Sequence, residues 1–260
     1  MRPIKIISDS TADLPKELIE KYDIEVLPLS VTLGENSYKD GLEISAQDIF
    51  KYYEETKGLP KTSAVSVLEY TEAFTTWVEK GYDVIHFTIS STMSSCYQNA
   101  CIAAVETGHV WSVDSANLSS GIGLQVVLAA ELAAKGESAE VIAKHIAEAK
   151  TRVDASFILN QLEFLHKGGR CSGVAALGAN LLKLKPCIEV VEGKMKVSFV
   201  LFKTEADGTL SCIAYCYLSS AAAEAAKESA RQQAMQEASK DAKSVKDFNA
   251  SVNEIIEAGK

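Results

Sequence analysis

Hydroxyl side chains cluster directly after a short apolar run near the middle of the chain. Residues 84–89 are mainly β-branched or aromatic, which is typical of a buried strand, and residues 101–106 are predicted to be helical. Between them, residues 90–95 hold five Ser or Thr in six positions. A turn from a strand into a helix brings hydroxyls and unpaired N–H groups to the positive end of the helix dipole, where anions bind. One hydroxyl suffices for a cap, so the cluster favours an anion or carboxylate site that includes Ser94 and Ser95.

Two other predicted strands end in similar residues. The first strand, residues 4–7, leads into Ser-Asp-Ser-Thr at 8–11, and the strand at 110–113 leads into Asp-Ser-Ala-Asn. Ligands of open parallel sheets bind beyond the carboxyl ends of the strands, so hydroxyls from three loops, Ser10 among them, should converge on one crevice. Ser, Asp and Asn also form turns, and for any single loop that is the simpler interpretation.

Strands and helices alternate through the first part of the chain. This alternation predicts an α/β fold with a mostly parallel sheet and helices on both faces. Asp13 is expected to cap the first helix, and residues 60–66 to form a polar loop. Besides those above, we predict a strand at 24–27, a hairpin crossing Gly34-Glu35-Asn36, and helices at 15–21, 45–56, 68–79, 120–134 and 137–152.

The pattern changes after residue 156. A short helix at 162–167 should end at Gly168-Gly169, directly before Arg170, and an apolar helix should cover 175–182. A strand at 186–191, a turn at 192–194 and a strand at 195–197 follow. We therefore expect three parts, an α/β lobe at 1–156, a smaller, incomplete second lobe at 157–218 and a polar helical tail at 219–260.

Composition excludes several functions. The chain has 260 residues and a net charge of −9, which argues against binding nucleic acid or an anionic membrane surface. No apolar run is long enough to span a membrane, and the N-terminus has no signal-peptide core, so we expect a cytoplasmic protein. Six cysteines without a Cys-x-x-Cys pair indicate free thiols rather than a metal site.

Catalytic machinery is not recognisable. The sequence has no Gly-x-Ser-x-Gly elbow, no paired carboxylates with a shared role and no glycine-rich phosphate loop. The four histidines show no spacing that suggests a catalytic pair: His86, His109, His145 and His166. We therefore predict a binding protein rather than an enzyme, with no catalytic residue, metal or cofactor.

A series of motifs resembles the DegV family of bacterial fatty-acid-binding proteins. The opening motif is Ile-Ile-Ser-Asp-Ser-Thr-Ala-Asp-Leu-Pro at 6–15, and the resemblance covers about residues 2–197. The later motifs follow in order at 38–41, 61–63, 90–98, 114–115, 167–170 and 185–186. The resemblance implies a two-lobe α/β fold with a long-chain fatty acid held between the lobes.

The resemblance also implies roles for individual residues. The fatty-acid carboxylate would be bound by the hydroxyls of Thr62 and Ser94, and the acyl chain would run into the smaller lobe. Ser63 and Ser95 lie in the same two motifs, and we add Ser10 and Arg170 as candidate ligands from their loops. Some members of the family present the carboxylate to a fatty acid kinase, which is therefore an expected partner.

The chain departs from the family pattern in its last part. After residue 197 it lacks the family's histidine-containing motifs, one of which lies near the carboxylate. Two alternatives to the carrier stay open. One is an enzyme acting on a small anionic substrate such as a phosphate ester, and the other is a partner-binding scaffold whose pocket is vestigial because its second lobe is incomplete. The lack of a recognisable base counts against the enzyme, and the missing motifs favour the scaffold.

Overall fold

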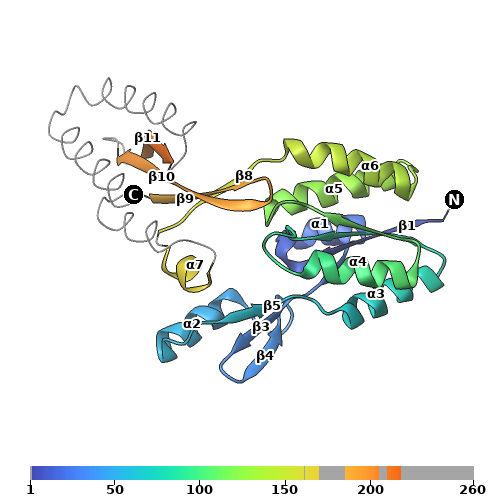
Figure 1. Ribbon diagram of the computed structural model, residues 1–260, viewed down its shortest axis with the longest axis horizontal. Coiled ribbons are helices and arrows are strands. Elements are labelled where there is room, and N and C mark those ends of the chain that lie inside the picture. Colours follow the sequence, from blue (N-terminus) through green and yellow to red (C-terminus); the bar gives the residue numbers. More distant parts are fainter. Residues whose placement is uncertain (1, 161, 170–184, 205–209, 218–260) are drawn as a thin grey trace. The chain divides into compact units, whose positions relative to one another are not determined.

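The computed structural model describes residues 2–160, 162–169, 185–204 and 210–217 (Figure 1). The chain divides into two compact units. The first contains residues 1–155 and the short segment 190–194, and the second contains residues 156–189 and 195–260. The predictions for Arg170, for the helix at 175–182 and for the tail at 219–260 lie outside the described residues.

The first unit is built on a four-stranded sheet in which every pair is parallel. Its strand order is β2–β1–β6–β7, comprising Glu25–Leu27, Ile4–Asp9, Asp83–Thr88 and Val110–Asp114. Register pairs Ile6 with Ile85, and Ile85 with Trp111. The predicted parallel α/β arrangement is confirmed, with the apolar run at 84–89 as a central strand.

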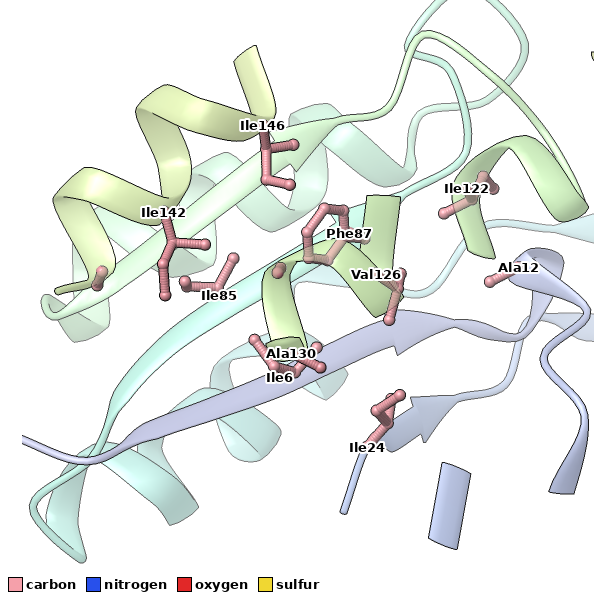
Figure 2. Packing of buried hydrophobic residues seen from close by; sticks show 12 residues of the cluster. Ile6, Ala12, Ile24, Ile85, Phe87, Ile122, Val126, Ala130, Ile142 and Ile146 are labelled. Carbon is pink, nitrogen blue, oxygen red and sulfur yellow. The ribbon is translucent and has the colours of Figure 1, made fainter. Parts of the chain in front are cut away.

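Helices cover both faces of this sheet. Successive side chains of a strand point to opposite faces, so Ile6, Ile85 and Phe87 pack with residues of α5 (Ser120–Ala134) and α6 (Ala139–Ala149), as Figure 2 shows. On the other face, Ile7 and Val84 pack with residues of α3 (Val67–Glu79) and α4 (Cys96–Thr107). Burial of one such large apolar side chain stabilises the fold by roughly 1.5–3 kcal/mol.

Local sequence signals explain the starts of two helices. Ser45 caps α2 (Ala46–Thr56) and Ser66 caps α3, each in a capping box with the acidic residue three positions later. The prediction that Asp13 caps the first helix is wrong, because α1 (Lys16–Tyr22) begins after Pro15 and Asp13 has a positive φ of 48°. Helix α4 begins five residues before the predicted segment at 101–106.

A small antiparallel sheet, β4–β3–β5, also belongs to the first unit. Its strands are β3 (Ser30–Leu33), β4 (Asn36–Lys39) and β5 (Lys61–Ser63). The prediction of a polar loop at 60–66 therefore misses β5, in which Thr62 pairs with Val31. All three β5 residues are exposed, so the segment lacks the apolar alternation that marks a half-buried strand.

A sheet with the order β11–β10–β9–β8 lies largely in the second unit, except for Ala155 and the residues of the 190–194 segment. Its strands are β8 (Ala155–Ile158), β9 (Lys185–Val191), β10 (Lys194–Thr204) and β11 (Leu210–Tyr217), and the short α7 (Glu163–Lys167) follows β8. The predicted strands at 186–191 and 195–197 correspond to β9 and β10, whereas β11 was not predicted. None of the described helices is long and apolar enough to cross a membrane.

Candidate functional site

The loops that follow β1, β6 and β7 meet at the carboxyl edge of the parallel sheet. The backbone N–H of Ser90, after β6, donates to the carbonyl of Asn117, after β7, at 2.9 Å. The N–H of Ser119 donates to the carbonyl of Thr11, after β1, also at 2.9 Å. These bonds place the three hydroxyl-containing loops together, as their positions at the ends of parallel strands predicted.

Three of the five hydroxyls in the β6–α4 loop hold the loop in place. Ser90 Oγ donates to the carbonyl oxygen of Gly193 at 2.7 Å, and Thr92 Oγ1 donates to the same oxygen. Ser91 donates to the Asp114 carboxylate through both its hydroxyl and its backbone N–H. The hydroxyl cluster is therefore in large part a structural device, and its size overstates the number of groups available for a ligand.

Ser94 and Ser95 remain at the start of α4. Ser94 is partly buried, and its Oγ donates to the Cys96 sulfur at 3.1 Å and accepts from the Cys96 N–H at 3.3 Å. Ser95 is the exposed N-cap residue, and its side chain makes no capping bond. Because a thiol sulfur is a weak acceptor, Ser94 can redirect its proton to a carboxylate at little cost.

Thr62 and Ser63 lie on β5, and the segment that follows β5 is hydrogen-bonded to α4. The side-chain amide of Asn99, in the first turn of α4, donates to the carbonyl of Val65 at 2.8 Å. Thr62 is three residues before Val65, a stretch that spans at most about 11 Å. Within the described part of the chain, the exposed hydroxyls of Thr62 and Ser63 have no hydrogen-bond partner. Four predicted hydroxyls thus lie in two neighbouring segments.

The other two predicted ligands differ from these four. The Ser10 hydroxyl donates to Asp40 Oδ2 at 2.7 Å and accepts from the Leu29 N–H at 3.2 Å, so it already connects three segments of the first unit. Arg170 lies outside the described residues. Among the residues that the structure describes, no three His, Cys, Asp or Glu side chains are placed to hold a metal ion.

A buried polar network lies beneath the start of α4. Tyr70 OH donates to Asp9 Oδ1 at 2.7 Å, and His86 Nε2 lies 3.1 Å from the same oxygen. All three residues are fully buried, and the His86 ring contacts the rings of Tyr70 and Phe74. Sequence spacing did not reveal the pairing of His86 with Asp9, because the two residues are 77 positions apart and meet through the pairing of β1 with β6.

The network keeps the Tyr70 hydroxyl and the Cys96 thiol, the hydrogen-bond acceptor of Ser94, in their neutral forms. Burial and the neighbouring Asp9 carboxylate raise the pKa of the Tyr70 hydroxyl well above its usual range. The same two causes raise the pKa of the Cys96 thiol. Cys96 therefore stays protonated at neutral pH and gives Ser94 a weakly accepting partner rather than a competing anion.

The fold and the site together define an α/β protein with a hydroxyl-lined loop at the carboxyl edge of a parallel sheet. The chain belongs to the DegV family, because the family model, described as an uncharacterised protein of the DegV family, matches residues 3–257. This match extends beyond residue 197, where the recognisable motifs end.

Relatives of known sequence and structure agree with this assignment. A DegV domain-containing protein from Clostridium perfringens is 39% identical over 199 residues, which cover 76% of this chain and 71% of the relative. A structure described as fatty acid binding of a DegV family protein from Thermus thermophilus has a TM-score of 0.69 and 34% identity, covering 76% of this chain and 70% of that one.

A second similar structure comes from Eubacterium ventriosum and is described as a stearic acid-binding protein. It has a TM-score of 0.68 and 26% identity, covering 91% of this chain and 76% of that chain. DegV from Bacillus subtilis, described as a fatty acid binding protein, has a TM-score of 0.65 and 29% identity, covering 75% of this chain and 70% of that one.

Proposed function

We propose that this chain is a carrier that binds a long-chain fatty acid and holds its carboxylate with the hydroxyls of Thr62 and Ser94. The observation that carries the proposal is the Ser94 hydroxyl, which lies at the N-terminus of a twelve-residue helix and has a thiol as its acceptor. Family membership, with relatives described as fatty acid binding, supports the choice of ligand.

The chemistry of the two segments suits a carboxylate. A carboxylate accepts hydrogen bonds only, and the Thr62 and Ser94 hydroxyls can both donate to it. The helix dipole of α4 favours negative charge at its N-terminus, where backbone N–H groups also lack intrahelical acceptors. Ser63 and Ser95, each adjacent to one of the two principal donors and exposed, are the secondary ligands in this proposal.

The acyl chain supplies most of the affinity in this proposal. Burial of one methylene is worth roughly 0.8 kcal/mol, so affinity should rise steeply with chain length until the slot is filled. Measured dissociation constants for acetate, octanoate and palmitate test this point by titration calorimetry. Equal affinity for acetate and palmitate would contradict a fatty-acid carrier and favour the enzyme on a small anionic substrate.

The finer elements of the proposal concern the cellular role. We infer a non-enzymatic, cytoplasmic carrier that uses no cofactor and presents the carboxylate to a fatty acid kinase. The resemblance to family members that work in this way supports the kinase as partner. Purified protein that contains no lipid by native mass spectrometry, and still captures the kinase, would favour the scaffold with a vestigial pocket.

Substitution of the two principal donors is the decisive experiment. Thr62→Val removes a hydroxyl while keeping the branched shape, and Ser94→Ala removes the second donor. A hydrogen bond to a charged group is worth roughly 1.5–3 kcal/mol, so each variant should bind palmitate about 10- to 150-fold more weakly. Binding of the corresponding fatty alcohol should stay about the same, since the alcohol lacks the charge.

A matched control comes from the opposite end of the same helix. Thr107 Oγ1 donates to the Ala103 carbonyl at 2.9 Å near the C-terminus of α4, so Thr107→Val removes a hydroxyl far along the helix from Ser94. This variant should bind palmitate like the wild type. Normal binding by both donor variants, together with loss of binding in Ser10→Ala, would move the carboxylate to the β1 loop and overturn the assignment.

A further inference from the structure

The carbonyl oxygen of Gly193 is the acceptor for two hydroxyls of the β6–α4 loop. Gly193 lies in the two-residue turn between β9 and β10, within the segment 190–194 that belongs to the first unit. Both turn residues have positive φ, 52° for Glu192 and 76° for Gly193, which is the backbone pattern of a type I′ hairpin turn. In this turn the Gly193 carbonyl accepts hydrogen bonds from Ser90 Oγ and Thr92 Oγ1.

A chain of hydrogen bonds connects this carbonyl to the proposed carboxylate ligand. Ser90, only 1% exposed, uses its Oγ to donate to Gly193 and to accept from the Thr92 N–H at 3.3 Å. Its backbone carbonyl accepts the N–H of Met93 at 2.9 Å and that of Ser94 at 3.3 Å. The turn that ends at Ser94 is therefore organised around Ser90, and Ser90 is held by Gly193.

Space at Gly193 makes this position intolerant of a side chain. A Cβ built on Gly193 would lie 2.6 Å from Ser90 Oγ, closer than real Cβ contacts, and 3.6 Å from the Cα of Ala116. Gly136 also has a positive φ, 83°, but a Cβ there would have no heavy atom within 4 Å. The two glycines thus share the backbone requirement and differ in the contact with the hydroxyl loop.

We propose that Gly193 is a positioning residue for the carboxylate site, because its carbonyl fixes the 90–94 turn and thereby the direction of the Ser94 hydroxyl. The proposal rests on the proposed binding of a fatty acid at Ser94. Ser90 and Thr92 act through the same contact and need not touch the ligand. A rigid turn places the donor before the ligand arrives, and this preorganisation raises affinity for the carboxylate.

Three variants of the full chain test the proposal. Gly193→Ala places a methyl group against Ser90 Oγ and also strains a backbone with positive φ. Gly136→Ala causes the same kind of backbone strain without a contact to the loop. Ser90→Ala/Thr92→Val removes both hydroxyl donors without straining the backbone. Palmitate and hexadecanol affinities are measured for each, and hydrogen exchange of the peptide covering residues 88–96 is followed in ligand-free protein. The exchange measurement reports on the turn whether or not a fatty acid binds.

Gly193→Ala and the double variant should bind palmitate about tenfold more weakly, bind hexadecanol as the wild type does, and exchange faster in residues 88–96. Gly136→Ala should match the wild type in all three. If Gly193→Ala fails to fold, the double variant gives the same answer. Two outcomes overturn this proposal alone, provided that the wild type binds palmitate. In one, Gly193→Ala and the double variant bind palmitate as tightly as the wild type does. In the other, they lose affinity equally for palmitate and hexadecanol. A wild type that binds neither ligand overturns the proposed function, and the positioning role with it.

Discussion

The two faces of the parallel sheet are packed in different ways. The cluster against α5 and α6 consists of apolar side chains, with Ile85 and Phe87 fully buried at its centre (Figure 2). The cluster against α3 and α4 also contains fully buried apolar residues, but Tyr70 and Cys96 belong to it and His86 lies against its rings. The face against α5 and α6 is mainly apolar, with the buried Gln125 as its polar exception, and the other face combines a core with a hydrogen-bonded network around Asp9.

This difference separates stability from positioning. Apolar contacts are non-directional, so most of the α5 and α6 face stabilises the fold without fixing a polar atom. The exception is Gln125, whose Nε2 donates to the Ser115 and Gly121 carbonyls at 3.0 Å. The network on the α3 and α4 face is directional, because a buried polar group left without its partner is costly. The network extends to Cys96, whose sulfur accepts a hydrogen bond from the Ser94 hydroxyl, so it lies next to the residue that is proposed to bind the carboxylate. We infer that the polar face carries the structural requirements of the site.

The largest effect should come from opening a cavity on the apolar face. Phe87→Ala removes a fully buried ring that packs among apolar side chains, and we expect a loss of about 3–5 kcal/mol in the free energy of unfolding. Urea denaturation followed by circular dichroism measures this loss. The folded fraction should bind palmitate normally, since Phe87 points away from the network.

Phe50 gives the matched control for this variant. Its side chain is 61% exposed on α2, so Phe50→Ala should change the unfolding free energy by less than about 0.5 kcal/mol. A loss below about 1 kcal/mol in Phe87→Ala would show that the apolar face is loosely packed. The contrast between the two faces would then not hold.

An intermediate effect is expected from the network on the other face. Tyr70→Phe keeps the ring and removes the hydroxyl that donates to Asp9 Oδ1 at 2.7 Å, which leaves a buried carboxyl oxygen with one partner fewer. The cost should be about 1–3 kcal/mol in the free energy of unfolding, measured by urea denaturation. Tyr22→Phe removes an exposed 3.3 Å hydrogen bond from a partly buried tyrosine to Glu131 and should change stability by less than about 0.5 kcal/mol. Equal effects in the two variants would mean that the buried hydrogen bond stabilises the fold no more than the exposed one does.

Sequence analysis could predict the elements whose signals are local. The apolar run at 84–89 identified β6, and Ser45 identified the start of α2. The exposed strand β5 carried no such signal. The hydrogen-bond partners of the loop hydroxyls also could not be predicted from local sequence. Ser90 meets Gly193 across 103 positions, and His86 meets Asp9 across 77, so neither contact follows from spacing.

The same limit explains how the candidate site was predicted. Residue types at strand ends predicted that three hydroxyl-containing loops meet at the carboxyl edge of the sheet, and the structure brings those loops together there. Residue types could not show which hydroxyls already have a partner within the protein. Ser91 and Ser94 are in the same loop, but of these two only Ser91 donates to a carboxylate of the protein itself, that of Asp114. The assignment of Thr62 and Ser94 as ligands came from the family resemblance and stays a prediction.

The smallest effect should come from Glu69, which is next to Tyr70 in sequence but 40% exposed. Burial opposes its ionisation, but hydrogen bonds donated by Lys39 and Ser66 lower the pKa of Glu69 to about 2 from its ordinary 4.5. A carboxylate with a lowered pKa stabilises the fold above the unfolded pKa, and this contribution is lost as pH falls from about 4.5 toward 2. Solvent screening reduces the effect, so Glu69→Gln should cost only about 0.3–1 kcal/mol at pH 7.

Urea midpoints of the wild type and Glu69→Gln at pH 7, 5 and 3.5 measure this contribution. The difference should be constant above pH 5 and narrower at pH 3.5, because the wild-type carboxylate begins to lose its advantage there. Asp48→Asn is the matched control, since Asp48 completes the same capping box with Ser45 on α2 but, among the described residues, accepts no hydrogen bond from a lysine. Its effect should be smaller than that of Glu69→Gln. A Glu69→Gln effect as large as that of Tyr70→Phe would show that exposure does not weaken the polar contacts of α3, and that the buried network is not what distinguishes this face of the sheet.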